Sequence, residues 1–413
     1  MLRDRTVVVT GLGVMTSIGC GRTAFWESLV SGKSGVRRTQ AFDPKHHRSQ
    51  IASEVLSFQP EIYLAHKQVR RMARVSQLAV AGAIEAVKDA GLDLDKEDAA
   101  AVGCIMGTGV GDYKELEEQH VKLLKRGPGH TNPFSVPKVV PNMPAANVGI
   151  ELGLHGPNFS VATACATGAH AIGLALGILR QGLAEVILAG GAESTITPLV
   201  VDAYDSMGAL SRRNHEPERA SRPFDAERDG FVIGEGVGVL VLETFDHARK
   251  RGAEILAVLG GFGMTCDAFN TVLPEPNGQW AAVAMENAIR DAGICKEDVG
   301  YINAHGTSTK VNDRVECLVI RKVFKDLAGT IPVSSNKSML GHTLAAAGAI
   351  EAAATVLTLR HGIIPPTINQ EVNDPECDLD FVPNEAREKE MKSALSNSFG
   401  FGGQNGVLAF SKA

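Results

Sequence analysis

Three short motifs occur twice in this chain in the same order, and this repetition constrains the fold more than any other feature. The matched pairs are Val9-Thr-Gly-Leu-Gly-Val-Met-Thr with Leu259-Gly-Gly-Phe-Gly-Met-Thr, Lys88-Asp-Ala-Gly-Leu with Arg290-Asp-Ala-Gly-Ile, and Leu179-Arg-Gln-Gly with Leu359-Arg-His-Gly. Three matches in one order indicate an internal duplication. No low-complexity linker divides the chain, so we predict two similar halves, 1–254 and 255–413, with similar sheets packed into one body.

Short β-branched runs alternate with longer helical periods, which is typical of an α/β protein. The clearest predicted strands are 6–10, 102–106, 185–189, 237–242 and 331–335, and the clearest helices are 76–90, 168–181, 279–292 and 345–361. The first half has extra residues, which we expect in the Pro- and Gly-rich stretch 111–144. The charged, turn-rich segment 211–230 is expected to be exposed.

Composition narrows the class of protein. With 413 residues, 44% hydrophobic and 21% charged, the chain has material for a large core. The net charge of −6 argues against a nucleic-acid binder. Seven cysteines without a Cys-x-x-Cys pair fit a reduced compartment. Because no signal peptide or apolar run of about 18 residues is visible, we expect a cytoplasmic protein without membrane contact.

Cys165 lies in Val-Ala-Thr-Ala-Cys165-Ala-Thr-Gly, between a β-like run and a helix of small residues. A sulfur near a helix N-terminus is expected to favour the thiolate. The small neighbours leave room for a substrate, so Cys165 is a candidate nucleophile. A packed core cysteine is the alternative.

His305 and His342 each lie at a polar turn after a strand-like run, in Asn-Ala-His305-Gly-Thr and Met-Leu-Gly-His342-Thr. Such histidines are often structural. Two neutral imidazoles that face one site could instead donate hydrogen bonds to a developing oxyanion. No third ligand stands at metal-site spacing, so we expect no metal.

Lys337 lies in an apolar segment and would need a carboxylate partner if it were buried. Glu351, Asp313 and Glu316 are the candidates. Phe401 lies in the Gly-rich stretch Phe399-Gly-Phe-Gly-Gly, which could supply an N–H group to an oxyanion hole or form an aromatic gate.

A basic helical run contains Lys67, Arg70, Arg71 and Arg74. A solvated helix face is one interpretation. In an acidic protein, the same cluster suits the docking of an acidic carrier protein.

The sequence resembles β-ketoacyl-acyl-carrier-protein synthases of the elongating type II kind, and also the ketosynthase subunits of bacterial polyketide systems. The resemblance runs from end to end. Its most specific parts are Thr163-Ala-Cys-Ala-Thr-Gly, Ser221-Arg-Pro-Phe-Asp, Asn303-Ala-His-Gly-Thr-Ser-Thr, Lys337-Ser-Met-Leu-Gly-His and Asn397-Ser-Phe-Gly-Phe-Gly-Gly. It implies an α/β thiolase fold, a five-layered αβαβα sandwich of two duplicated halves, usually dimeric.

The resemblance also implies a two-stage reaction without a cofactor. Cys165 would accept an acyl chain from acyl carrier protein, with the Cys165 and Phe401 N–H groups holding the oxyanion. Malonyl carrier protein would then lose CO₂, with His305 and His342 stabilising the enolate. The remaining implied roles are ordering of the histidines by Lys337 with Glu351, Asp313 and Glu316, pantetheine binding by Thr307 and Thr309, acyl-pocket contacts from Val110, Phe399 and Phe401, and carrier docking by Lys67, Arg70, Arg71 and Arg74.

Two other functions stay open at this point. One is a ketosynthase subunit of a type II polyketide or polyene pathway, in a homodimer or in a heterodimer with a chain-length partner. The other is a non-catalytic chain-length partner, against which Cys165 argues. Lys310, Ala345 and Gln404 depart from the commonest residues of the family, which bears on the substrate rather than on the reaction type.

Overall fold

The computed structural model describes residues 5–413, so residues 1–4 of the predicted first half lie outside the described residues. Ten strands form one hydrogen-bonded row of two five-strand halves. The first half runs β1 (Val7–Thr16), β8 (Gly236–Thr244), β7 (Val186–Glu193), β5 (Val102–Gly107) and β6 (Asn158–Phe159). The second runs β9 (Ala257–Cys266), β15 (Gln404–Ser411), β14 (Ser393–Gly400), β10 (Val299–Asn303) and β11 (Val333–Ser334).

The two halves have the same strand directions. In each, the first three strands are antiparallel and the last three are parallel. The halves meet where β1 pairs with β9 over Val7–Val9 and Ala257–Leu259. Hydrogen bonding is therefore continuous from β1 of the first half to β9 of the second half, whereas the sequence predicted two similar sheets packed together. The boundary at 254 and 255 stays a prediction.

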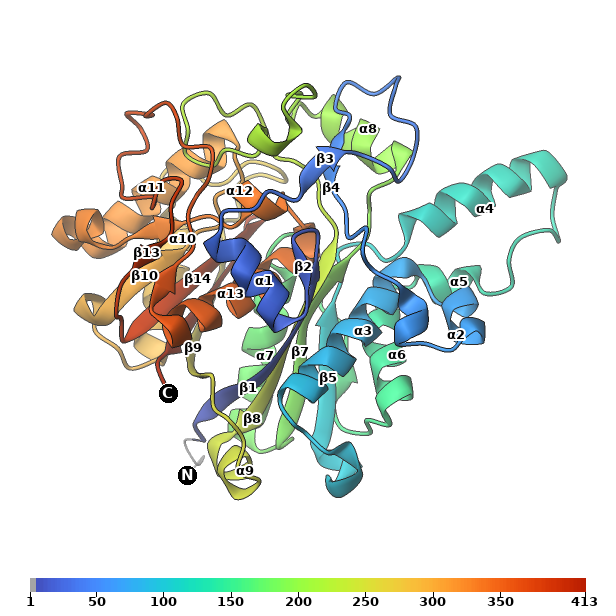
Figure 1. Cartoon of the computed structure of the whole chain (residues 1–413), viewed down its shortest axis with the longest axis horizontal. Helices are drawn as coiled ribbons and strands as arrows, with labels where there is room; N and C mark the ends of the chain where they lie inside the picture. The colour runs from blue at the N-terminus through green and yellow to red at the C-terminus, as the bar shows by residue number, and fades with distance from the viewer. Residues whose placement is uncertain (1–4) are drawn as a thin grey trace.

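Helices complete five layers (Figure 1). The buried helices α7 (Thr167–Gln181) and α13 (Ala347–His361) contact strands of both halves and form the middle layer. The outer face of the first half is covered by α3 (Arg74–Asp89) and α6 (Met143–Leu152), and that of the second half by α10 (Gln279–Asp291) and α11 (Lys310–Phe324). Because α13 is apolar nearly all round, it suits a position between two sheets. The predicted five-layered sandwich is confirmed.

The repeated glycines let helix backbone touch strand backbone. A Cβ atom on Gly13 of β1 would lie 1.8 Å from the Gly82 carbonyl oxygen of α3. A Cβ atom on Gly263 of β9 would lie 1.9 Å from the Ala284 carbonyl oxygen of α10. No residue with a side chain fits such a contact, which explains why glycine occupies both positions.

The repeated Asp-Ala-Gly motif fastens each helix end to its strand. The Leu12 N–H of β1 donates to Asp89 Oδ2, and the Phe262 N–H of β9 donates to Asp291 Oδ2, both at 2.9 Å. The same contact therefore builds both halves.

Most of the predicted elements are present, with shifted ends. The last predicted strand shrinks to the two residues of β11, and the last predicted helix begins with a 3-10 turn at Leu344–Ala346. The stretch 111–144 contains α4 (Tyr113–Arg126), which projects from the body in Figure 1, and α5 (Ser135–Val139). No helix within residues 5–413 is long and apolar enough to span a bilayer.

The expectation that segment 211–230 is exposed holds for only part of it. Residues 212–219 are exposed or half-buried, but residues 220–225 are buried. Arg222, Asp225 and Arg228 in this segment are buried, at 1%, 0% and 3% exposure. Arg222 Nε donates to Asp225 Oδ1 at 3.0 Å, and Arg228 pairs with Asp374. Paired charges can be buried where unpaired ones cannot, so charge alone did not indicate exposure here.

We predict that Gly263→Ala and Gly13→Ala destabilise the protein to a similar extent, by at least about 2 kcal/mol, because each added methyl group overlaps a helix carbonyl. Gly177→Ala in α7 is the matched control, since a Cβ atom there meets nothing within 4 Å. It should be neutral or stabilising by up to about 1 kcal/mol. Thermal unfolding measures all three, and equal melting temperatures would contradict the packing argument.

Candidate active site

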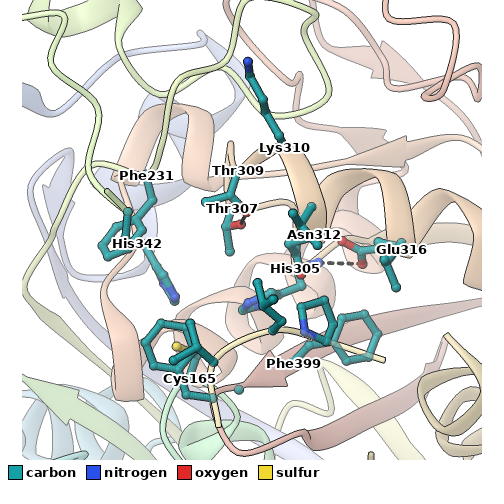
Figure 2. Close-up of a pocket in the computed structure, with 18 of the residues that line it drawn as sticks. Cys165, Phe231, His305, Thr307, Thr309, Lys310, Asn312, Glu316, His342 and Phe399 are labelled. Atoms are coloured by element: carbon teal, nitrogen blue, oxygen red, sulfur yellow. Dashed lines mark hydrogen bonds between the residues drawn. The ribbon is translucent and has the colours of Figure 1, made fainter. Parts of the chain in front are cut away.

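Reactive side chains from four segments meet at the carboxyl ends of the parallel strands of the two halves. Cys165 lies between β6 and α7, His305 follows β10, and His342 lies between β11 and α13. Together with Phe399 and Phe401 near the end of β14, they line one cavity of about 520 Å³. Figure 2 shows the sulfur and both imidazoles facing the same space. Parallel strands carry their carboxyl ends to one edge of a sheet, which brings these distant segments together.

A strained turn presents Cys165. Ala164 has φ +48°, an unusual conformation for a residue with a side chain. The Ala166 N–H donates to the Thr163 carbonyl at 3.1 Å, and α7 begins one residue later. Gly400 packs against this turn, since a Cβ atom on it would lie 2.8 Å from the Thr163 oxygen. This close approach brings the Phe401 N–H group to the Cys165 sulfur.

The expected preference of Cys165 for the thiolate is wrong for the free protein. Burial raises the pKa of Cys165 to about 12, although the Lys337 charge and the Phe401 N–H group lower it. Cys165 is only 7% exposed. Loss of hydration therefore outweighs the groups that favour the anion, and the thiol must give up its proton to another group when it reacts.

His305 is held at its backbone and at one ring nitrogen. Glu316 accepts the His305 N–H at 2.8 Å and the Gly306 N–H at 2.7 Å. The Lys337 ammonium lies 3.4 Å from His305 Nδ1. An ammonium can only donate, so Nδ1 accepts and the ring proton resides on Nε2.

His342 is fixed in the same tautomer by a different contact. The backbone N–H of His342 donates to the Val232 carbonyl at 2.7 Å. The Phe231 ring packs against the imidazole, with ring centroids 5.3 Å apart. The Leu344 N–H donates to His342 Nδ1 at 3.3 Å. The proton of this ring therefore also resides on Nε2.

The two imidazoles lie side by side, with ring centroids 5.4 Å apart. Burial lowers the pKa of both histidines well below 6.5, and the Lys337 charge lowers both further. Both rings are therefore neutral near pH 7. Two neutral Nε2–H groups beside one sulfur can donate hydrogen bonds to an oxyanion.

Of the three candidate partners of Lys337, Glu351 is the one that contacts it. Both side chains are buried, and Lys337 Nζ donates to Glu351 Oε1. Glu316 instead holds the His305 backbone. Asp313 accepts the Phe224 N–H at 2.8 Å and also the N–H of Thr307, so it supports the turn after His305.

The other predicted substrate contacts divide into two groups. Thr307 and Thr309 line the cavity, and their hydroxyl oxygens are 2.9 Å apart. Phe399 also lines it, with its ring 5.8 Å from that of His305. Val110 does not line this cavity and is 38% exposed. Its part in acyl binding stays a prediction.

Arg74 differs from the other members of the predicted docking cluster. It already donates to Glu235 at 2.9 and 2.7 Å and to the Val55 carbonyl, so its part in carrier docking stays a prediction. Lys67, Arg70 and Arg71 on α2 (His66–Arg71) are exposed and form no ion pair within residues 5–413.

Sequence reasoning missed four residues around the site: Phe231 and Leu344, which contact or flank His342, Tyr204, whose ring lies 6.4 Å from that of Phe401, and Glu193. A buried glutamate at the end of a glycine-containing apolar strand was the signal for Glu193. Within the described chain, no group of three or more His, Cys, Asp or Glu side chains is placed to hold a metal ion.

The chain matches two family models, the β-ketoacyl synthase N-terminal domain over residues 4–248 and the β-ketoacyl synthase C-terminal domain over residues 256–371. It is 45% identical to the 3-oxoacyl-(acyl-carrier-protein) synthase 2 of Coxiella burnetii (strain RSA 493 / Nine Mile phase I), over 100% of this chain and 99% of that protein.

Two solved structures are also similar. The ishigamide ketosynthase/chain length factor is 36% identical with a TM-score of 0.94, over 99% of this chain and 100% of that one. A type II PKS acyl-carrier protein in complex with its ketosynthase bound to the hexaketide (AntDE:AntF) is 33% identical with a TM-score of 0.92, over 100% of both chains. With the duplicated five-layered fold and the cavity that Cys165, His305 and His342 share, these matches show that the chain belongs to the β-ketoacyl synthase family.

Proposed function

We propose that this protein condenses an acyl-enzyme thioester with malonyl-acyl carrier protein, giving 3-oxoacyl-acyl carrier protein, CO₂ and free carrier protein, as in fatty acid elongation. The observation that carries the proposal is the shared cavity of Cys165, His305 and His342, with Nδ1 of both rings occupied. The site thus offers one nucleophile and two oriented Nε2–H donors to a single thioester.

In the first stage, the Cys165 sulfur attacks the thioester carbonyl of the acyl carrier. As the C–S bond of the acyl carrier breaks, the thiol proton passes to the departing pantetheine sulfur, so that the carrier leaves as a free thiol. The N–H groups of Cys165 and Phe401 stabilise the oxyanion, and Phe401 N–H already lies at the sulfur. This stage leaves the acyl chain on Cys165.

In the second stage, malonyl carrier protein binds and its carboxylate leaves as CO₂. The electron pair of the broken C–C bond forms an enolate, whose oxygen accepts hydrogen bonds from Nε2–H of His305 and His342. The enolate carbon attacks the acyl-enzyme carbonyl, a C–C bond forms, and the Cys165 thiolate departs and is reprotonated. Lys337 and Glu351 keep the His305 tautomer fixed throughout.

An acyl carrier protein is the proposed partner. The exposed Lys67, Arg70 and Arg71 supply positive charge in a protein of net charge −6. The relative that is 33% identical was solved with its acyl-carrier protein. Exposed apolar residues on and near the projecting α4, such as Leu124, Val136 and Ile150, are consistent with a dimer. A cytoplasmic location follows from this carrier-dependent chemistry.

A second candidate function is a ketosynthase subunit of a type II polyketide or polyene pathway, homodimeric or paired with a chain-length subunit. The two similar solved structures, at TM-scores of 0.94 and 0.92, favour keeping it. The presence of Cys165 in the cavity argues against a non-catalytic partner. Mass spectrometry of products from a panel of acyl carriers tests the choice. A single extension of saturated acyl carriers to 3-oxoacyl products supports elongation, whereas repeated extension to chains with several oxo groups, or a preference for unsaturated acyl carriers, supports the second candidate.

Cys165→Ala should abolish acyl-enzyme formation, because no other cysteine lines the cavity within the described chain. Intact-protein mass spectrometry after mixing with an acyl carrier measures the transfer. The matched control is Cys104→Ala, which removes a buried cysteine of β5 and should leave labelling intact. Persistent labelling of the Cys165 variant would refute the assignment of the nucleophile.

His305→Ala and His342→Ala should each lower malonyl decarboxylation by roughly 100-fold, the usual effect of losing one oxyanion donor. Acylation of Cys165 should fall much less, since the Cys165 and Phe401 N–H groups that stabilise the oxyanion of that stage remain. Release of labelled CO₂ and acyl transfer are measured separately. An equal loss in both half-reactions would contradict the division of roles.

Charge reversal of Arg70 and Arg71 to Glu should weaken carrier binding several-fold at low salt, and the difference should shrink as salt screens the charges. The control reverses Arg249 and Lys250, exposed basic residues of α9 (Phe245–Lys250). Equal effects of the two double variants on the KM for carrier would argue against a specific docking surface on α2.

A further inference from the structure

Glu193 is a buried carboxylate for which the reaction above has no use. It is the last residue of β7 and is 1% exposed. It accepts hydrogen bonds from the Thr108 hydroxyl at 3.0 Å and from the Gly109 N–H at 2.9 Å. The backbone N–H groups of Ser194 and Ala345 donate to it as well. Four donors therefore converge on one side chain with no cationic partner within the described residues.

The hydrogen bond from the Ala345 N–H to Glu193 is linked to the active site through Leu344 and His342. Leu344 has φ +49°, which costs a residue with a Cβ atom about 1 kcal/mol or more. The Leu344 N–H group is the one that donates to His342 Nδ1 at 3.3 Å. The strained turn thus sets the tautomer of His342, and the hydrogen bond from Ala345 to Glu193 holds the residue directly after it.

The ends of β5 and β7 pack tightly around this turn. A Cβ atom on Gly191 would lie 2.5 Å from the Ala345 carbonyl oxygen, and one on Gly109 would lie 2.8 Å from Glu193 Oε2. Burial raises the pKa of Glu193 to about 7, whereas its hydrogen bonds lower it. Three of the four surrounding groups are backbone N–H groups, which can only donate, so a carboxylate that accepts on its oxygens satisfies the arrangement best.

We propose that Glu193 is a positioning residue for His342: through Ala345 it holds the strained Leu344 turn, whose N–H group keeps the His342 Nδ1 acceptor in place and so directs the Nε2–H group at the enolate oxygen. This inference rests on the proposed condensation. It assigns to Glu193 a role in the decarboxylation half-reaction and none in acyl transfer to Cys165.

Glu193→Gln tests the proposal, because the new amide NH₂ group faces N–H and O–H donors in an almost unchanged volume. Malonyl decarboxylation should fall about tenfold, in line with the effect of losing a group that orients a reacting side chain. Acylation of Cys165 should stay within about twofold of the wild-type rate. The control is Glu243→Gln, which removes a buried carboxylate bound by Thr10, His247 and Arg251. Glu243 lies on the neighbouring strand β8, at the end away from Glu193, so this change should leave the ratio of the two rates unchanged.

A double-mutant cycle separates positioning from general destabilisation. The tenfold effect of Glu193→Gln should vanish in the His342→Ala background, where no imidazole remains to be oriented, and should persist in the His305→Ala background. Equal losses in both backgrounds, or an equal loss of acylation, would overturn the proposal.

Thr108→Val provides a second variant if Glu193→Gln does not fold, since it removes one donor while the carboxylate stays. It should give a smaller loss of decarboxylation that again depends on His342, and a loss independent of His342 would count against the inference. Failure of the wild-type protein to acylate Cys165 or to release CO₂ would instead overturn the proposed function itself.

Discussion

Gly13 in β1 and Gly263 in β9 let α3 and α10 lie directly on their strands, and the arrangement of the five layers depends on these contacts. Each helix is then fastened by the aspartate of its Asp-Ala-Gly motif. The outer helices cover one face of each half, and α7 and α13 contact the other face of both halves. The middle layer is therefore common to both halves, and the turns before its two helices carry Cys165 and His342 into one cavity.

Burial of this cavity then decides its electrostatics. Removing the imidazoles from water lowers the pKa of both, and the Lys337 charge lowers them further. The same burial raises the pKa of Cys165, so the free site holds a neutral thiol beside two neutral rings. Neutral rings with Nδ1 occupied are hydrogen-bond donors at Nε2, which suits an enolate. A charged imidazolium next to Lys337 would suffer like-charge repulsion in a poorly solvated site.

The sequence predicted the duplication, the α/β class and the convergence of the cysteine and both histidines, because these depend on local patterns repeated along the chain. It failed where an outcome depends on a contact between distant residues. The sequence did not show that Arg74 pairs with Glu235. It also did not show that the part of segment 211–230 around Arg222 and Arg228 is buried, because their partners Glu371 and Asp374 lie far along the chain. The thiolate expected at Cys165 followed from the helix N-terminus alone, whereas the depth of burial is a property of the whole fold.

The duplication also explains why neither half could provide this site by itself. β7 and β14 occupy the same place in the strand order of their halves. At the end of β7, Glu193 accepts the Ala345 N–H beside His342, which belongs to the second half. At the end of β14, Gly400 allows the Phe401 N–H group to reach Cys165, which belongs to the first half. Equivalent strand ends thus act on opposite halves, one with a carboxylate acceptor and the other with a backbone donor. A change that separates the halves by even a small shift should therefore impair the nucleophile and the enolate site together, although the two are built from different chemistry.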